Sequence, residues 1–143
     1  MSVRPKLRQA WQRLRGGELT PKRAALSVGI GLVVGLVPAY GFHWAIVLAM
    51  CVPLRLDAPV AYLAANISNP LFAPFLFLAE VQIGSLVMTG ATLPLTKEAL
   101  QARGPGAFIG ETILGIAILA PAAALVFGWL TYVLVAWRQK RGA

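Results

Sequence analysis

The side chains that could do chemistry or bind a polar ligand are few, and most of them lie inside long apolar blocks. Asn66, Ser68 and Asn69 fall within four positions, immediately before Pro70. An amide or hydroxyl group without a hydrogen-bond partner is strongly unfavourable in hydrocarbon, so these groups must face protein, water or a ligand. They therefore either cap a broken backbone or form a substrate-binding site, where freed amides at helix N-termini would attract an anionic group.

Two ionisable side chains complete the predicted site. His43 is the only histidine, and Glu80 lies between two apolar runs. Such a carboxyl group must pair, with Arg55 or His43, become neutral, or lie near a wet interface. Ionisable groups at membrane depth are candidate functional groups, so both residues belong to the predicted site. The structural alternatives are a hydrogen-bonded interior group for His43 and a wet interfacial position for Glu80. The predicted substrate-binding residues are Asn66, Ser68, Asn69, His43 and Glu80.

Motifs of catalysis and of metal or cofactor binding are scarce. The sequence contains no His-Glu-x-x-His, glycine-rich phosphate loop, Gly-x-Ser-x-Gly or Cys-x-x-Cys pattern. Cys51 is the only cysteine, so one chain cannot build a disulfide framework or a thiolate metal site. We therefore expect no metal, no cofactor and no catalytic residue, and a membrane-bound hydrolase is only the third hypothesis.

Composition indicates a membrane protein. Of the 143 residues, 58% are hydrophobic and 13% are charged, whereas soluble domains contain about 25% charged residues. The apolar residues form three blocks, at 24–54, 58–95 and 108–137, and about 20 such residues suffice to cross the hydrocarbon core of a bilayer. We expect an all-α integral membrane protein.

The net charge of +8 is concentrated at the two ends of the sequence. Seven basic residues precede the first apolar block and three follow the last one, which is the positive-inside pattern for cytoplasmic segments. Residues 1–19 read as a basic amphipathic helix on anionic lipid head groups, or as a disordered basic tail. Both termini are thus expected in the cytoplasm, and nucleic acid is not an expected partner.

Each of the first two blocks contains a segment that should break a helix. If wholly helical, residues 24–54 would extend about 46 Å, well beyond a hydrocarbon core of about 30 Å. Pro38 and Gly41 interrupt the first block, and Pro70 interrupts the second. Either the segments are re-entrant hairpins or each is one kinked, tilted span. Paired interrupted segments are typical of transporter sites.

The rest of the sequence predicts a loop, a last span and a close contact between helices. Residues 96–106 read as a loop, and Glu111 is expected at an exposed interface near the start of the last span. The simplest topology has one re-entrant hairpin and two full spans. Gly31 and Gly35 are spaced for close helix packing, and a dimerisation face is the alternative. We expect 20–143 to form a single membrane domain.

A further set of residues resembles a known family: Thr20-Pro21, Gly31, Gly35, Pro38, Gly41, Arg55-Leu56-Asp57, Asn69-Pro70 and Gly84. Together they resemble the bacterial membrane family catalogued as domain of unknown function 2062, over residues 20–86. Asp57 departs from an expected asparagine, and Phe72 from a frequent threonine. The resemblance implies a small inner-membrane protein, sometimes attached to sugar-transferring enzymes, and it implies no catalytic residue.

These observations support two hypotheses of function. In the first, the chain is transporter-like or lipid-handling, and the two broken segments meet to present Asn66, Asn69 and His43 to a polar or anionic group. In the second, it is a scaffold or regulator that holds a partner membrane enzyme through its basic N-terminal helix and small-residue faces. Membrane lipids are expected partners in both, and self-association is open.

Overall fold

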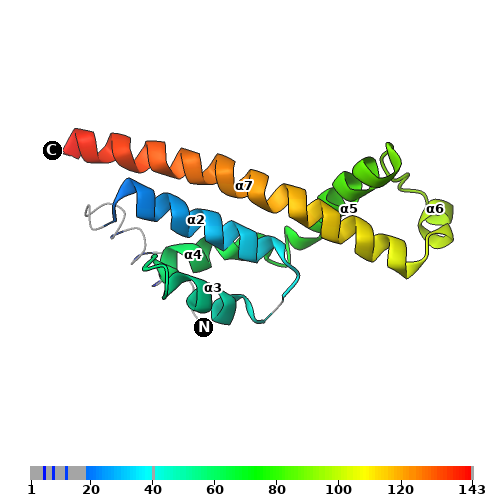
Figure 1. Cartoon of the computed structure of the whole chain (residues 1–143), viewed down its shortest axis with the longest axis horizontal. Helices are drawn as coiled ribbons and strands as arrows, with labels where there is room; N and C mark the ends of the chain where they lie inside the picture. The colour runs from blue at the N-terminus through cyan, green and yellow to red at the C-terminus, as the bar shows by residue number, and fades with distance from the viewer. Residues whose placement is uncertain (1–4, 6–7, 9–11, 13–18, 40, 143) are drawn as a thin grey trace. The chain divides into compact units, whose positions relative to one another are not determined.

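The computed structural model describes residues 5, 8, 12, 19–39 and 41–142, and the labels below are those of Figure 1. Every regular element in this part of the chain is helical, so the predicted all-α fold class is confirmed. The predicted helix at 1–19 falls almost wholly outside the described residues.

The chain forms two compact units. The first unit comprises Met1–Ile67 with Ala122–Ala143, and the second comprises Ser68–Pro121. Helix α7 (Pro105–Gly142) contributes its N-terminal part to the second unit and its C-terminal part to the first.

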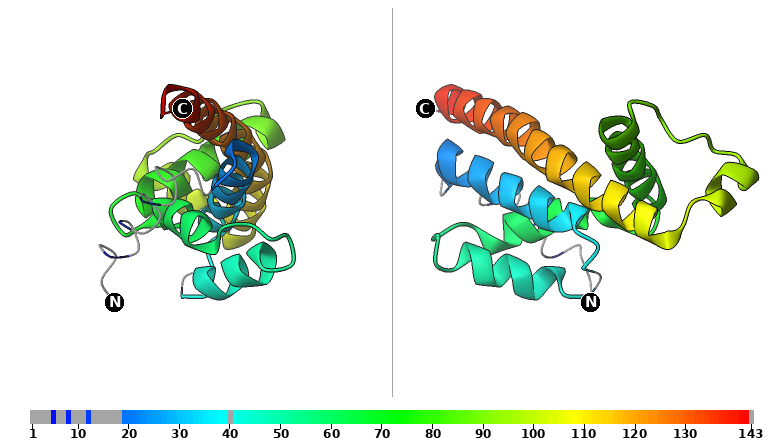
Figure 2. Two further views of the ribbon diagram at one scale, coloured as in Figure 1. Left: turned by 90° about the vertical axis from the view of Figure 1, so that its left-hand side faces the viewer. Right: turned by 45° about the vertical axis from the view of Figure 1, so that its right-hand side comes forward.

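Three short helices and the end of α7 build the first unit. Helix α2 (Pro21–Leu36) begins with Thr20, whose hydroxyl oxygen accepts a hydrogen bond from the amide of Arg23 at 3.3 Å. Proline at the first helical position loses no helical hydrogen bond there. Helix α3 (His43–Cys51) returns beside α2, and α4 (Ala58–Ala65) packs on both (Figures 1 and 2).

Small residues hold α2 against α4. A side chain on Gly31 would collide with the carbonyl group of Ala61, and one on Gly35 would come within 2.6 Å of the carbonyl oxygen of Ala65. The backbones of the two helices are therefore in direct contact. The buried core beside this contact consists of Val34, Val47, Cys51, Ala61 and Ala65.

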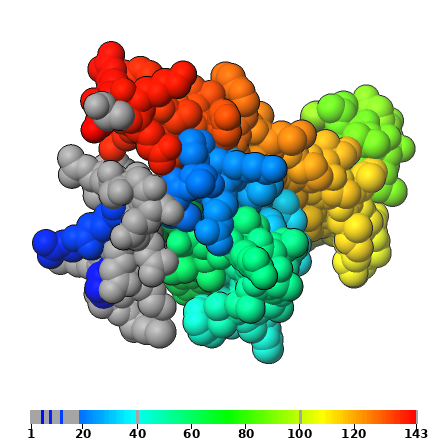
Figure 3. Space-filling view, turned by 60° about the vertical axis from the view of Figure 1, so that its left-hand side comes forward, coloured from blue at the N-terminus to red at the C-terminus, as the bar shows by residue number. Residues whose placement is uncertain are grey.

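The other face of α2 lies along α7. An added side-chain carbon on Gly29 would meet that of Ala124 at 3.6 Å, and one on Gly128 would lie 3.3 Å from the carbonyl oxygen of Ala25. The side chain of Gln139 donates to the carbonyl oxygen of Leu19 at 2.9 Å. The start of α2 and the end of α7 are thus neighbours, as the space-filling view also shows (Figure 3).

The second unit is a helical hairpin with a structured connection. The short 3-10 helix η1 (Asn66–Ser68), which contains the boundary between the two units, precedes α5 (Ala73–Thr89), and α5 lies against the first part of α7 (Figure 2). The connection contains α6 (Lys97–Ala102), which the hydroxyl group of Thr96 caps by accepting from the amide of Ala99 at 3.3 Å. The segment expected to be only a loop therefore contains a helix of about one and two-thirds turns.

Among the described helices, α7 is the one that alone is long and apolar enough to cross a membrane, with a mean hydropathy of 2.3 over its best window. A second candidate exists only if Ala58–Ser68 and Ala73–Thr89 count together as one broken span. Helices α2 and α3 have 16 and 9 residues, or about 24 and 14 Å, which is less than a hydrocarbon core of about 30 Å.

Candidate functional site

The first break in the helices is a turn closed by the predicted site histidine. Helix α2 ends at Leu36, and Gly41 has φ of +88°, a conformation that side-chain-bearing residues rarely adopt. The His43 ring nitrogen Nε2 lies 3.0 Å from the carbonyl oxygen of Val37, a hydrogen bond across the turn. His43 thus links the two arms of the α2–α3 hairpin at its tip.

At the second break, two of the predicted site residues serve the backbone. The Asn66 side chain donates to the carbonyl oxygen of Tyr62 at 2.6 Å. The Asn69 side-chain oxygen accepts from the amides of Leu71 and Phe72, at 3.0 and 3.1 Å. The Leu71 amide has this oxygen as its acceptor, whereas the Tyr62 carbonyl oxygen and the Phe72 amide also bond to backbone groups. A ligand role for either asparagine stays a prediction.

Ser68 is the member of this group that a ligand could still use. Its hydroxyl oxygen is buried and has no hydrogen-bond partner among the described residues. Ser68 and Asn69 belong to the second unit, as does Glu80, whereas His43 and Asn66 belong to the first. Within each unit the structure places these residues at helix ends, except for Glu80, which lies in the middle of α5.

Glu80 lies where α5 crosses α7. A side chain on Gly115 would collide with the backbone carbonyl group of Glu80, and one on Gly84 would collide with that of Glu111. The two helices therefore touch twice, each through a glycine that faces a glutamate of the other. Glu80 is 4% exposed and Glu111 is 2% exposed. This crossing buries two carboxyl groups in the second unit.

The two carboxyl groups differ in their partners. Glu111 forms an ion pair with Arg103, while its other oxygen, Oε2, is buried without a hydrogen-bond partner. Glu80 has no hydrogen-bond or ion-pair partner in the described part of the chain. The expectation that Glu111 would be exposed is wrong, because the close approach at Gly84 encloses its side chain.

A polar network fastens the α5–α6 connection to α5. Both ends of the Gln82 amide bind the backbone of Leu93: its nitrogen donates to the carbonyl oxygen at 2.9 Å, and its oxygen accepts from the amide at 2.7 Å. The hydroxyl group of Ser85 donates to the carbonyl oxygen of Ala91 at 3.1 Å. Among the described residues no group of three or more histidine, cysteine, aspartate or glutamate side chains could hold a metal ion.

Comparison with known proteins gives one match. The model of the family described as "Uncharacterized protein conserved in bacteria (DUF2062)" matches residues 4–143. The chain belongs to this family. No curated protein and no solved structure matches. The match thus extends well beyond residues 20–86, which contain the motifs of the resemblance.

In this DUF2062 chain, the Arg55-Leu56-Asp57 segment forms a tight turn that is tied to α2. Arg55 has φ of +52°, and its carbonyl oxygen accepts from the guanidinium group of Arg23, with Nε at 2.9 Å. The Asp57 amide donates to the buried hydroxyl group of Ser27 at 2.9 Å, and this hydroxyl donates to the carbonyl oxygen of Arg23 at 2.8 Å. Arg23 and Ser27, which lie one helical turn apart on α2, therefore hold the segment at 55–57 in place.

Asp57 also caps α4, since its Oδ1 accepts from the amide of Val60 at 3.0 Å. The carbonyl oxygen of an asparagine could accept the same bond, which explains why the departure from asparagine at this position leaves the turn intact. Sequence reasoning missed Arg23, Ser27 and Gln82, because each acts through a contact with a distant segment. It also missed the repeated Glu-x-x-x-Gly spacing at 80–84 and 111–115, which was visible in the sequence.

Proposed function

We propose that this chain is an integral protein of the bacterial cytoplasmic membrane that handles anionic lipids at its cytoplasmic end. The observation that supports this proposal is the concentration of basic side chains at one end of the first unit. Contacts between Arg23 and Arg55, and between Gln139 and Leu19, bring the start of α2, the α3–α4 turn and the end of α7 together. This end carries Lys22, Arg23, Arg55, Arg138, Lys140 and Arg141.

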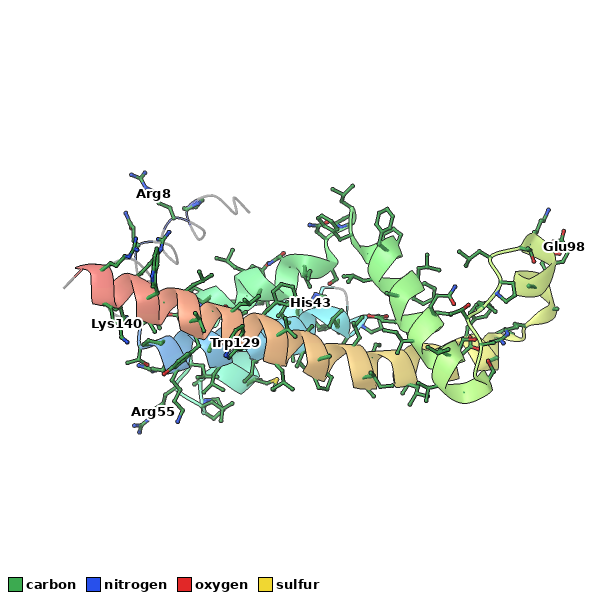
Figure 4. The ribbon with its side chains drawn as sticks, turned by 90° about the horizontal axis from the view of Figure 1, so that it is seen from above. Arg8, His43, Arg55, Glu98, Trp129 and Lys140 are labelled. Carbon is green, nitrogen blue, oxygen red and sulfur yellow. The ribbon has the colours of Figure 1, made fainter. Side chains whose placement is uncertain are left out.

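The charge at this end is strongly one-sided. Asp57 is the acidic residue described there, and its side chain caps α4. In Figure 4, Arg55 and Lys140 lie toward this end of the first unit, and His43 lies away from it. Basic clusters next to apolar helices favour the cytoplasmic side and attract anionic head groups, at about 1 kcal/mol for each lysine or arginine near the surface.

The shape of the α2–α3 hairpin supports a re-entrant segment. Both arms are shorter than the hydrocarbon core, and the chain returns from the tip to the basic end. Phe42 at the tip is 69% exposed, and Trp44 in the next turn is 51% exposed. Large apolar side chains exposed at a tip are favourable in hydrocarbon and unfavourable in water. The hairpin would thus enter and leave the bilayer from the cytoplasmic side.

Lipid handling has more support here than passage of a solute through a polar site at the breaks. The side-chain atoms of Asn66 and Asn69 that form hydrogen bonds do so with nearby backbone groups. At the basic end, in contrast, the basic side chains outnumber the described acidic side chains around them. A scaffold for a membrane enzyme remains the second candidate, favoured by the exposed apolar side chains of α7, which include Leu125 and Leu134.

Thiol labelling in membrane vesicles tests the orientation. In a Cys51→Ala background, a cysteine at Arg141 should react with an impermeant reagent only from the cytoplasmic side, and a cysteine at Phe42 should react from neither side until detergent is added. A Phe42 cysteine that reacts from the outer side would show a spanning hairpin and refute the re-entrant segment.

Thermal unfolding in lipid nanodiscs tests the lipid preference. Ligands that bind the folded state raise the midpoint of unfolding. Replacing part of a phosphatidylcholine bilayer by phosphatidylglycerol should raise the midpoint, and high salt should reduce this effect because it screens exposed charges. An equal midpoint in both bilayers would contradict the proposal.

A further inference from the structure

An apolar groove runs between α2 and the C-terminal part of α7, within the first unit. Its volume is about 470 Å³, within the range of about 300–1,000 Å³ that is typical of small-molecule sites. Alanine, glycine and branched aliphatic residues line most of it, and Trp129 and Tyr132 lie along its α7 side.

The groove exists because small residues face each other across the two helices. Gly29 lies opposite Ala124, and Gly128 lies opposite Ala25, so the two backbones approach closely, and larger side chains beside this contact border the groove. Leu125 and Trp129 stand on its border, and they are 74% and 65% exposed. An elongated apolar chain lying between these borders would contact both helices.

Two lysines extend the same helix faces toward the basic end. Lys22 lies one turn before Ala25 and Leu26 on α2, and Lys140 lies about three turns after Trp129, the groove residue whose side of α7 it shares. Both are exposed, and neither has a hydrogen-bond or ion-pair partner in the part of the chain that the structure describes. Arg23 and Arg141 are engaged, with the Arg55 carbonyl oxygen and the Trp137 ring.

We infer that this groove binds an anionic phospholipid, with one acyl chain between α2 and α7 and the phosphate group held by Lys22 and Lys140. The inference rests on the proposed function and names the place where the lipid binds. An apolar groove that continues into two cations, each without a partner among the described residues, matches a molecule with an apolar tail and an anionic head. Tyr132, between the two regions, lies where amphipathic aromatic rings are favourable in a membrane interface.

A second copy of the chain fits this groove less well. Two copies in one bilayer have the same orientation, so α7 of a neighbour would bring its own basic end beside Lys22 and Lys140. Like charges placed together oppose such a contact. An anionic lipid neutralises the same charges, and each lysine that contacts it should contribute roughly five-fold to the preference for an anionic over a zwitterionic head group.

Fluorescence quenching by brominated lipids tests the site. The full chain is placed in phosphatidylcholine nanodiscs with a minor fraction of brominated phosphatidylglycerol or, separately, of brominated phosphatidylcholine. The difference between the natural chain and Trp129→Phe isolates the signal of Trp129. We expect brominated phosphatidylglycerol to quench Trp129 more strongly than brominated phosphatidylcholine at the same fraction.

Charge variants identify the head-group contacts. Lys22→Gln and Lys140→Gln should each reduce the excess quenching roughly five-fold, while Lys97→Gln, which removes a lysine of the second unit, should leave it unchanged. Gly29→Leu adds volume to the groove and should reduce quenching by both lipids, with Gly106→Leu as the control, since Gly106 faces open space. The exposed lysines can be changed without altering the helix contacts, so these variants retain the fold.

Two results would overturn the inference. Equal quenching by the two brominated lipids, unaffected by the lysine variants, would mean that Trp129 faces only bulk lipid. Unquenched Trp129 together with a cross-link between cysteines at Leu125 of two copies would assign the groove to self-association. If phosphatidylglycerol still raises the unfolding midpoint in either case, only the groove assignment fails; if it does not, the proposed function fails as well.

Discussion

At the scale of single residues, the contacts between α5 and α7 are the most sensitive to substitution. Gly115→Ala would place a methyl group against the carbonyl group of Glu80, so the helices must separate. Overpacking of this kind costs about 1–3 kcal/mol. Thermal unfolding followed by circular dichroism in detergent should show this loss, whereas Gly106→Ala in the same helix should be neutral or slightly stabilising. Equal behaviour of the two variants would contradict the described crossing.

The ion pair between Arg103 and Glu111 gives a second prediction. Removing one partner of a buried ion pair costs about 3–5 kcal/mol. Because the Arg103 side chain is 27% exposed, Arg103→Ala should lower the free energy of unfolding by about 3 kcal/mol or less. Because the unpaired Glu111 carboxylate causes the loss, adding Glu111→Gln should restore part of the stability. The double-mutant cycle measures the coupling, and additive losses would argue against the pair.

At the scale of elements, one side-chain oxygen helps to hold the break before α5. Asn69→Ala removes the acceptor of the Leu71 amide and one of two acceptors of the Phe72 amide, which also donates to the Asn69 backbone carbonyl oxygen, and should lower the unfolding free energy by about 1 kcal/mol, as for other caps. Asn69→Asp keeps an acceptor and should retain most of the stability. In a lipid or transport assay, loss of function in Asn69→Asp with full stability would instead indicate that the amide nitrogen contacts a ligand.

Local elements could be predicted from the sequence, and long-range contacts could not. Thr20 and Pro21 begin a helix, and the helices end beside Pro38 and Pro70, because caps and breakers act within a few residues. The burial of Glu111 depends on its register against Gly84, which lies 27 positions earlier in the sequence. No local pattern fixes that register. Similarly, Arg23 and Ser27 hold the turn at Arg55 only once α2 and α4 are packed.

At the scale of the whole molecule, the basic end predicts how membrane binding responds to charge. Replacing Arg138, Lys140 and Arg141 by glutamine should weaken the stabilisation by phosphatidylglycerol, because these residues end α7 beside the start of α2. Labelling of a cysteine at position 142 should also become less restricted to the cytoplasmic side. If neither the labelling pattern nor the stabilisation by phosphatidylglycerol changes, the charges that determine them lie outside α7.

The length of α7 has a consequence for its proposed insertion in a bilayer. No formal charge occurs between Glu111 and Arg138, a stretch of about 40 Å along a helix, whereas the hydrocarbon core measures about 30 Å. A helix upright in such a bilayer would leave apolar turns in the head-group region, and inclination removes this mismatch at a modest energy. Polarised infrared spectroscopy should therefore find α7 more inclined in lipids with short acyl chains and more upright in lipids with long ones.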